Sequence, residues 1–297
     1  MSENTYFDWG NLFNFLRLMG LAPYERTETG NYNVSKKFQL YSFTIAFLVS
    51  LFFYFDDGII KGYLDGENLL SIAFLLLNVL GYTFASVFCI LATVYKATQF
   101  SFLINKIIEL NKDLDKSPIL RTKNRYGFKL YLYCICQGFL FITNNIIYII
   151  SEKNRNLVYY FTCILTSLTG QAFVATDINF VIFVNNSFII FKKINCVLYL
   201  KKNLSNLKTL RKTCSKACDI NDLINKCFSE MLLVLVTTEF SALVFLVYFK
   251  NKHDSRGFTA VPIFWLLTYF LKLFIKIESG RSVKSEVKYL YIIQLNK

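Results

Sequence analysis

The sequence predicts an all-α, multi-pass transmembrane bundle, because it is strongly apolar, contains long uncharged runs and gathers its cations in alternate segments. Of its 297 residues, 54% are hydrophobic and 18% aromatic, and the mean hydropathy is +0.39. Soluble domains carry more charge and fewer apolar side chains. Pro and Gly are scarce, at 3 and 12 residues, which excludes collagen and low-complexity disorder. The membrane class follows, with residues 1–297 as one domain.

Six runs are suited to crossing a bilayer as helices. A span needs about 20 largely apolar residues to cross about 30 Å of hydrocarbon. The predicted spans are 38–55, 69–95, 130–150, 157–177, 231–249 and 258–275. The first three contain no charge, whereas the fifth carries Glu239 and the sixth carries Lys272. The fourth run stays apolar to Phe191, so we expect it to leave the membrane as a helix.

The cations give the orientation of these spans. Of the 33 Lys and Arg residues, 26 lie in the odd-numbered segments between spans, 6 lie in the even-numbered ones, and Lys272 lies within a span. Cytosolic loops carry an excess of Lys and Arg. The N-terminus is therefore predicted in the cytosol, and six crossings return the C-terminus there. The net charge of +13 then reflects topology, and no nucleic-acid partner is expected.

The longest connections, 96–129 and 192–228, face the cytosol in this topology, so helices four to six are expected to extend into a cytosolic base. Apolar residues recur at helical spacing in a pattern interpreted as a continuation of the fourth helix: Leu200, Leu204, Leu207 and Leu210. A second pattern follows the sixth span: Val283, Val287 and Leu290. It predicts either a helix lying on anionic lipid or one packed into the base. Packing is favoured, because two separate apolar stripes need each other.

Several short motifs resemble one known family. Around the fifth span they are Ile224-Asn225, Phe228-Ser229, Leu232-Leu233 and Val247-Tyr248-Phe249. Elsewhere they are Gly20-Leu21-Ala22-Pro23, Trp265, Val283-Lys284-Ser285-Glu286, Leu290 and Ile292-Ile293. Together they are similar to the insect gustatory receptors, a family of chemosensory seven-helix ligand-gated channels. The likeness covers the whole chain in topology and about residues 220–295 in motif detail.

The resemblance implies a taste receptor of the plasma membrane with a cytosolic N-terminus. It further implies a homo- or hetero-tetrameric cation channel, gated by a small-molecule tastant, whose seventh helices line the pore. Two features depart from the family: Gly280 stands where Cys is frequent, and the seventh-helix signature, Thr-Tyr followed by an apolar run and Gln-Phe, is absent from residues 1–297. Thr268-Tyr269 lies upstream of the Val283 motif and is not that signature.

The missing signature leaves three alternatives: an incomplete gene model, a truncated isoform, or a non-conducting interaction subunit. From another class, a secondary transporter is the alternative function. It would show inverted repeats and helices broken by Gly or Pro, for which Pro262 is the only candidate.

Glu239 is the most informative single residue, because an ionisable group inside a span needs a partner or water. It lies about 12 Å from the inner end of its span, and Lys272 lies about 4.5 Å from the inner end of the next. Two interpretations stay open, an interhelical pair between them and a water-filled ligand cavity lined by Glu239. Asp177 falls about 30 Å along its helix, at the inner boundary, where a structural role is expected.

Polar and aromatic side chains of the outer half form a candidate ligand pocket with Glu239: Asn144, Asn145, Tyr148, Tyr159 and Trp265. Aromatic walls with a few polar contacts are typical of small-ligand sites. The competing interpretation is that the aromatic residues belt the membrane interface and the Asn residues bond between helices.

Enzymatic function is not expected. His253 is the only histidine, so a multi-His metal site cannot be built. The sequence holds no Gly-rich phosphate loop and no Gly-x-Ser-x-Gly motif. We predict no catalytic residue, no metal and no cofactor.

Overall fold

The computed structural model describes residues 9–51, 69–115, 157–200, 207–252 and 260–295. Its helices are α1 (Trp9–Leu18), α2 (Lys36–Ser50), α5 (Leu69–Tyr95), α6 (Ala97–Asp115), α8 (Leu157–Leu200), α9 (Leu207–Lys252) and α10 (Ala260–Leu295). Two short strands, β1 (Tyr24–Arg26) and β2 (Tyr32–Val34), form an antiparallel hairpin in which Glu25 is paired with Asn33. The helical class predicted from the sequence is confirmed, and the hairpin is an addition to it.

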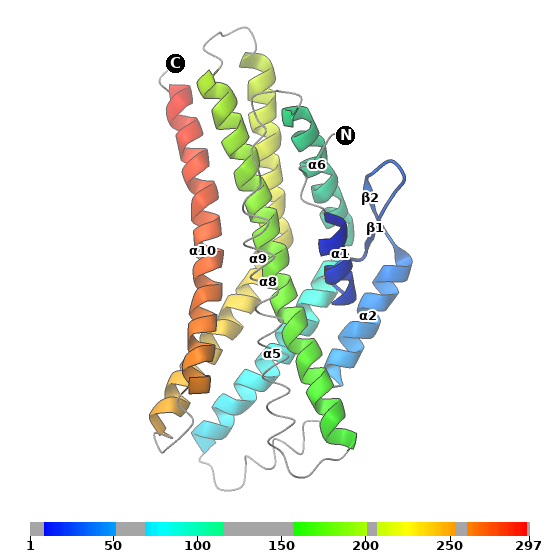
Figure 1. Cartoon of the computed structure of the whole chain (residues 1–297), viewed down its shortest axis with the longest axis vertical. Coiled ribbons are helices and arrows are strands. Elements are labelled where there is room, and N and C mark those ends of the chain that lie inside the picture. Colours follow the sequence, from blue (N-terminus) through cyan, green and yellow to red (C-terminus); the bar gives the residue numbers. More distant parts are fainter. Residues whose placement is uncertain (1–8, 52–68, 116–156, 201–206, 253–259, 296–297) are drawn as a thin grey trace.

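Three helices are longer than a bilayer requires. With 44, 46 and 36 residues, α8, α9 and α10 extend about 66, 69 and 54 Å, against about 30 Å of hydrocarbon. They pack on one another and run together toward the end of the molecule where the C-terminus lies (Figure 1). Val283 is buried there and Val287 packs against the same core. Of the two interpretations of this stripe, packing into a helical base is therefore the correct one.

One sequence assignment is wrong at its boundary. We expected Leu207 and Leu210 to continue the fourth helix, but α8 ends at Leu200 and Leu207 is the first residue of α9. Apolar spacing is the same on either side of a turn, so periodicity alone does not place the turn. Leu204 lies outside the described residues.

Among the described residues, two helices are long and apolar enough to cross a membrane, at Leu168–Leu198 and Leu210–Phe245. The α5–α6 pair gives a third if its two parts are one broken span, and these parts meet at 70°. The six-span count therefore stays a prediction, and the predicted span at 130–150 lies outside the described residues.

The bend between α5 and α6 falls at Lys96, with no Gly or Pro beside it. Lys96 N donates to Ala92 O at 2.9 Å, and Phe100 N donates to Lys96 O at 3.0 Å. Lys96 thus closes the last turn of α5 with its N–H and opens the first turn of α6 with its carbonyl oxygen. Phe100 packs edge-on against Phe228 of α9, with ring centroids 5.1 Å apart.

The first helix ends at a glycine. Gly20 has φ +74° and closes α1, with Leu21 N donating to Leu16 O at 2.8 Å and Gly20 N donating to Arg17 O at 3.0 Å. These two bonds form a Schellman motif, which favours glycine at this position.

The hairpin is attached to α6 through Asn105. Tyr32 N donates to Asn105 Oδ1 at 2.8 Å, and Asn105 Nδ2 donates to Tyr32 O at 2.9 Å.

Candidate functional site: a buried charge cluster

Four charged side chains meet where α8, α9 and α10 pack together. They are Asp177 of α8, Glu239 of α9, and Lys272 and Lys276 of α10, and each is at most 7% exposed. An ionised side chain in such surroundings is stable only when it is paired or hydrogen-bonded. These four, which balance to zero net charge, are named the charge cluster below.

Lys276 lies between both carboxylates of the charge cluster. Its Nζ is 2.6 Å from Asp177 Oδ1 and 2.7 Å from Glu239 Oε2, to which it donates a hydrogen bond. One ammonium therefore connects three long helices. Two carboxylates so close would repel each other without it.

Lys272 occupies a different environment one turn away. Its Nζ lies 5.2 Å from the ring centroid of Phe173 and 5.6 Å from that of Tyr269, both within the range of cation–π attraction. Tyr82 of α5 completes this aromatic wall, with its ring centroid 5.0 Å from that of Phe173 and 6.1 Å from that of Tyr269. The second lysine is thus held over aromatic rings, beside the carboxylates.

The structure corrects the predicted partner of Glu239. An interhelical pair exists, but with Lys276 in place of Lys272. The prediction compared distances from the inner end of each span, as if the helices were perpendicular to the membrane, and it placed Lys276 outside the sixth span. In the structure α9 and α10 cross, and the crossing decides which turn of α10 contacts Glu239. Asp177, expected at a boundary where it could be hydrated, is 2% exposed and shares the same lysine. The alternative role of Glu239, lining a ligand cavity, stays a prediction.

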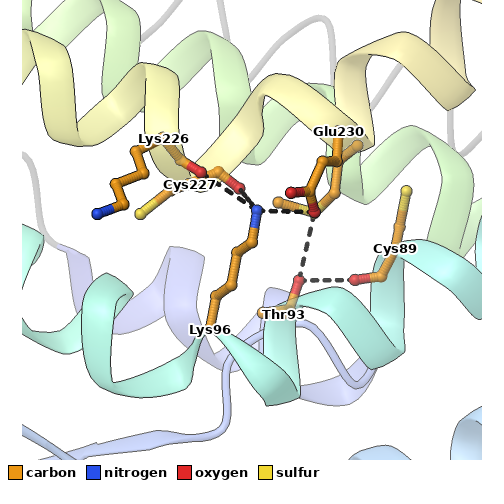
Figure 2. A network of polar contacts seen from close by, with 7 residues as sticks. Cys89, Thr93, Lys96, Lys226, Cys227 and Glu230 are labelled. Carbon is orange, nitrogen blue, oxygen red and sulfur yellow. Dashed lines mark hydrogen bonds and ion pairs between the residues drawn. The ribbon is translucent and has the colours of Figure 1, made fainter.

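A second buried cation holds the α5–α6 bend against α9 (Figure 2). Lys96 Nζ donates to the backbone oxygens of Lys226 at 3.2 Å and Cys227 at 3.4 Å, and pairs with Glu230 Oε2 at 3.0 Å. One turn earlier, Thr93 Oγ1 donates to Cys89 O at 2.8 Å within α5. The bend is therefore fixed by a lysine side chain that binds the backbone of a neighbouring helix.

The described part of the structure does not bring the other residues of the predicted ligand pocket together. Asn144, Asn145 and Tyr148 lie outside the described residues. Tyr159 stands in the first turn of α8 and Trp265 in the first third of α10, and the structure describes their backbone alone.

Sequence reasoning missed two functional candidates, Lys96 and Lys276, because both were assigned to cytosolic segments. One signal could have found the second. Lys272 and Lys276 are four residues apart, so they share a helix face, and a pair of lysines on one face calls for more acidic partners than Glu239 alone.

The distribution of side chains defines the class of protein. The charge cluster is buried inside the bundle, while large apolar side chains on α9 and α10 are exposed, among them Leu233 at 70%, Phe240 at 62% and Phe274 at 62%. Such an arrangement is stable where hydrocarbon surrounds the helices. This is a helical membrane protein with a charge cluster buried in an otherwise apolar core.

The family is more specific. Residues 11–290 match the model of the 7tm chemosensory receptors, and the chain belongs to that family. A comparison with curated protein sequences finds no match. Membership makes the chain a chemosensory receptor of the gustatory type, a class of ligand-gated channels, and confirms the function predicted from its motifs. It also decides against the transporter alternative and against an enzyme.

Proposed function

We propose that this receptor lies in the plasma membrane with its N-terminus in the cytosol, crosses six times, and binds a small tastant in its outer half. Ligand binding shifts the packing of α8, α9 and α10, and their extended ends carry that shift to neighbouring subunits of a tetramer. A ligand acts in this way only through different affinities for two arrangements of the helices.

The observation that carries the proposal is the sharing of Lys276 by Asp177 and Glu239. Through one ammonium, a displacement of any of three helices changes the contacts of the other two. Coupling between distant sites needs an element with two discrete arrangements, and a buried ion pair that is either made or broken provides one.

The orientation is supported by the uneven distribution of Lys and Arg between alternate segments. Epitope tags at the two termini test it in intact and permeabilised cells. Tags stained only after permeabilisation agree with cytosolic termini, and staining of either tag on intact cells contradicts the map.

The ligand site is proposed at Asn144, Asn145, Tyr148, Tyr159 and Trp265. Calcium imaging of cells that express the chain with related receptor subunits, against panels of sugars, amino acids and bitter compounds, tests it. Trp265→Ala is expected to lower the apparent affinity for an agonist at unchanged surface expression. Phe270→Ala is the matched control, because Phe270 is 57% exposed on the same helix.

Glu239→Gln separates the two roles of Glu239. Loss of folded protein supports the ion pair with Lys276, whereas an altered agonist response in well-expressed protein supports a ligand-cavity role. A third result, normal expression with a normal response, contradicts both.

Conduction requires the family's seventh helix, from this chain or from related subunits. Sequencing the transcript past the codon for Lys297 tests the first source, for which an in-frame apolar run ending in Gln-Phe is the expected sign. Co-purification with a related receptor tests the second.

A further inference from the structure

Two buried lysines four residues apart on α10, Lys272 and Lys276, lie at the charge cluster. The residue four positions further on is Gly280, which is exposed. Residues four apart lie on one helix face, separated by about one turn of 5.4 Å. The position that Lys276 occupies between the carboxylates would therefore be taken by Lys272 if α10 moved one turn toward the end that carries the C-terminus.

The two carboxylates can accept either lysine. Asp177 Oδ2 and Glu239 Oε1 are buried and accept no hydrogen bond from the described residues. Within the same part of the chain, Lys272 makes no ion pair with them and lies over the ring of Phe173. The Phe173 ring thus holds Lys272 close to the two carboxylates while Lys276 is paired with them.

We propose that α10 has two registers against α8 and α9, with either Lys276 or Lys272 between Asp177 and Glu239, and that the membrane potential selects between them. The receptor would then sense voltage as well as ligand. Movement by one turn in the opposite direction would bring Gly280 to the carboxylates and leave both without an ammonium. Only the registers with Lys276 or Lys272 between the carboxylates are therefore available. The exchange between them is a shift of α10 by one turn along α8 and α9.

Two described contacts of α10 keep their character after such a shift. Trp265 would take the place of Tyr269 in the aromatic wall, so a large ring replaces another. Asn195 of α8 donates through Nδ2 to Glu286 Oε2 at 2.6 Å and to Glu286 O at 3.1 Å. Ser282 would take the place of Glu286, and its hydroxyl and carbonyl can accept the same amide protons.

The two registers are unequal in energy without a field. Val283 is 6% exposed in the core, and the shift would put Ser279 in its place. Loss of buried apolar surface disfavours the shifted register. The arrangement with Lys276 between the carboxylates, which is the one observed, is therefore the resting register at zero potential.

The expected voltage dependence follows from the distance. A one-turn shift carries two lysines through about 5.4 Å of about 30 Å of hydrocarbon, which moves about 0.36 of an elementary charge per chain. The ratio of the two registers then changes about fourfold per 100 mV for each chain. In the proposed orientation, a negative cytosol draws the lysines inward and favours the register with Lys272 between the carboxylates.

Disulfide trapping in the full chain tests the proposal. In a Cys196→Ser background, Asn195→Cys is combined with Glu286→Cys to report the observed register, or with Ser282→Cys to report the shifted one. Membrane vesicles are poised at 0 and −100 mV, cytosolic side negative, with potassium gradients and valinomycin, then oxidised with copper phenanthroline. The ratio of the two cross-linking rates is expected to move about fourfold toward the Ser282→Cys pair at −100 mV.

Lys272 variants supply the matched controls. Lys272→Gln removes the second ammonium, so cross-linking at position 282 should become slow. Its voltage dependence should fall to about twofold per 100 mV, because Lys276 alone still moves, whereas Lys272→Arg should retain the fourfold shift. Cross-linking of the Glu286→Cys pair verifies that each variant is folded. A ratio independent of potential with Lys272 present, or a full voltage effect of about fourfold together with fast cross-linking at position 282 in Lys272→Gln, overturns the proposal. A voltage effect of opposite sign supports the exchange and overturns the proposed orientation, on which only the direction depends.

Discussion

Lys276 Nζ lies 2.7 Å from Glu239 Oε2, which joins α10 to α9 inside a bundle that exposes large apolar side chains on both helices. The same ammonium lies 2.6 Å from Asp177 on α8. Removal of this one group therefore leaves two buried carboxylates facing each other, whereas removal of either carboxylate keeps one ion pair but leaves two buried lysines against a single carboxylate.

We predict that Lys276→Met destabilises the protein by about 3–5 kcal/mol, the usual cost of breaking a buried pair from one side. Thermal unfolding in detergent, followed by fluorescence-detected size exclusion, measures the effect. Lys272→Met is the control, since Lys272 lies over rings and should cost about 2 kcal/mol or less. Equal losses from the two substitutions would contradict the arrangement of the charge cluster.

The Lys96 side chain should matter more than its acidic partner. Lys96→Met removes two hydrogen bonds from a charged donor to the α9 backbone, and we expect a loss of about 1.5–3 kcal/mol. Glu230 is 64% exposed, so Glu230→Gln should cost about 1 kcal/mol or less because solvent screens the pair. The same unfolding assay compares them. A larger effect from Glu230→Gln would show that the ion pair, and not the backbone contact, fixes the bend.

Two glycines give opposite predictions for the same substitution. Gly20→Ala forces a side chain into φ +74° and brings its Cβ within 3.3 Å of Ile45 Cβ, so a loss of about 1–3 kcal/mol is expected. Gly280 lies on α10 with nothing within 4 Å of the added Cβ, and Gly280→Ala should stabilise the helix by about 0.5–1 kcal/mol. Melting temperatures that move in the same direction would refute this account of Gly20.

The hairpin should open when its fastening to α6 is removed. Asn105→Leu leaves Tyr32 N without its acceptor, at an expected cost of about 1–3 kcal/mol. Arg26 in β1 is exposed and offers trypsin a cleavage site, so the cleavage rate reports opening, with about a tenfold increase for 1.4 kcal/mol. Glu28→Gln, at an exposed turn residue, should leave the rate unchanged. Unaltered cleavage in Asn105→Leu would mean that other contacts hold the hairpin.

The pKa of the Tyr24 hydroxyl also reflects the packing of the hairpin against α1. Burial raises the pKa of the Tyr24 hydroxyl far above its usual range, because the phenolate would be separated from water. Its ring packs edge-on against Phe13 at 5.3 Å between centroids. Tyr24 therefore acts as an apolar core residue of the hairpin and is neutral at physiological pH.

Runs of uncharged residues predicted several helices well. The second span, 69–95, coincides with α5, and the fourth run lies within α8. The sixth run, 258–275, lies within α10 from Ala260 onward, and 258–259 lie outside the described residues. The length and hydropathy of a helix are local properties, so they can be evaluated from the sequence without knowledge of the fold. The hairpin was not predicted, because its strands are three residues each and depend on Asn105, 73 residues away from Tyr32.

By itself, the sequence determined the class of this protein, required compensation for a charge at Glu239 and favoured packing of the Val283 stripe, but it left the ion pair and the ligand cavity as open alternatives for Glu239. Composition and periodicity are enough for these conclusions, since apolar helices must lie in lipid or a core and buried charges must be compensated. The tertiary structure alone decided that Lys276 is the partner, that Asp177 shares it, and that Lys96 bends one helix against another. These contacts depend on where helices cross, and crossing angles arise from packing of side chains that are distant in the sequence.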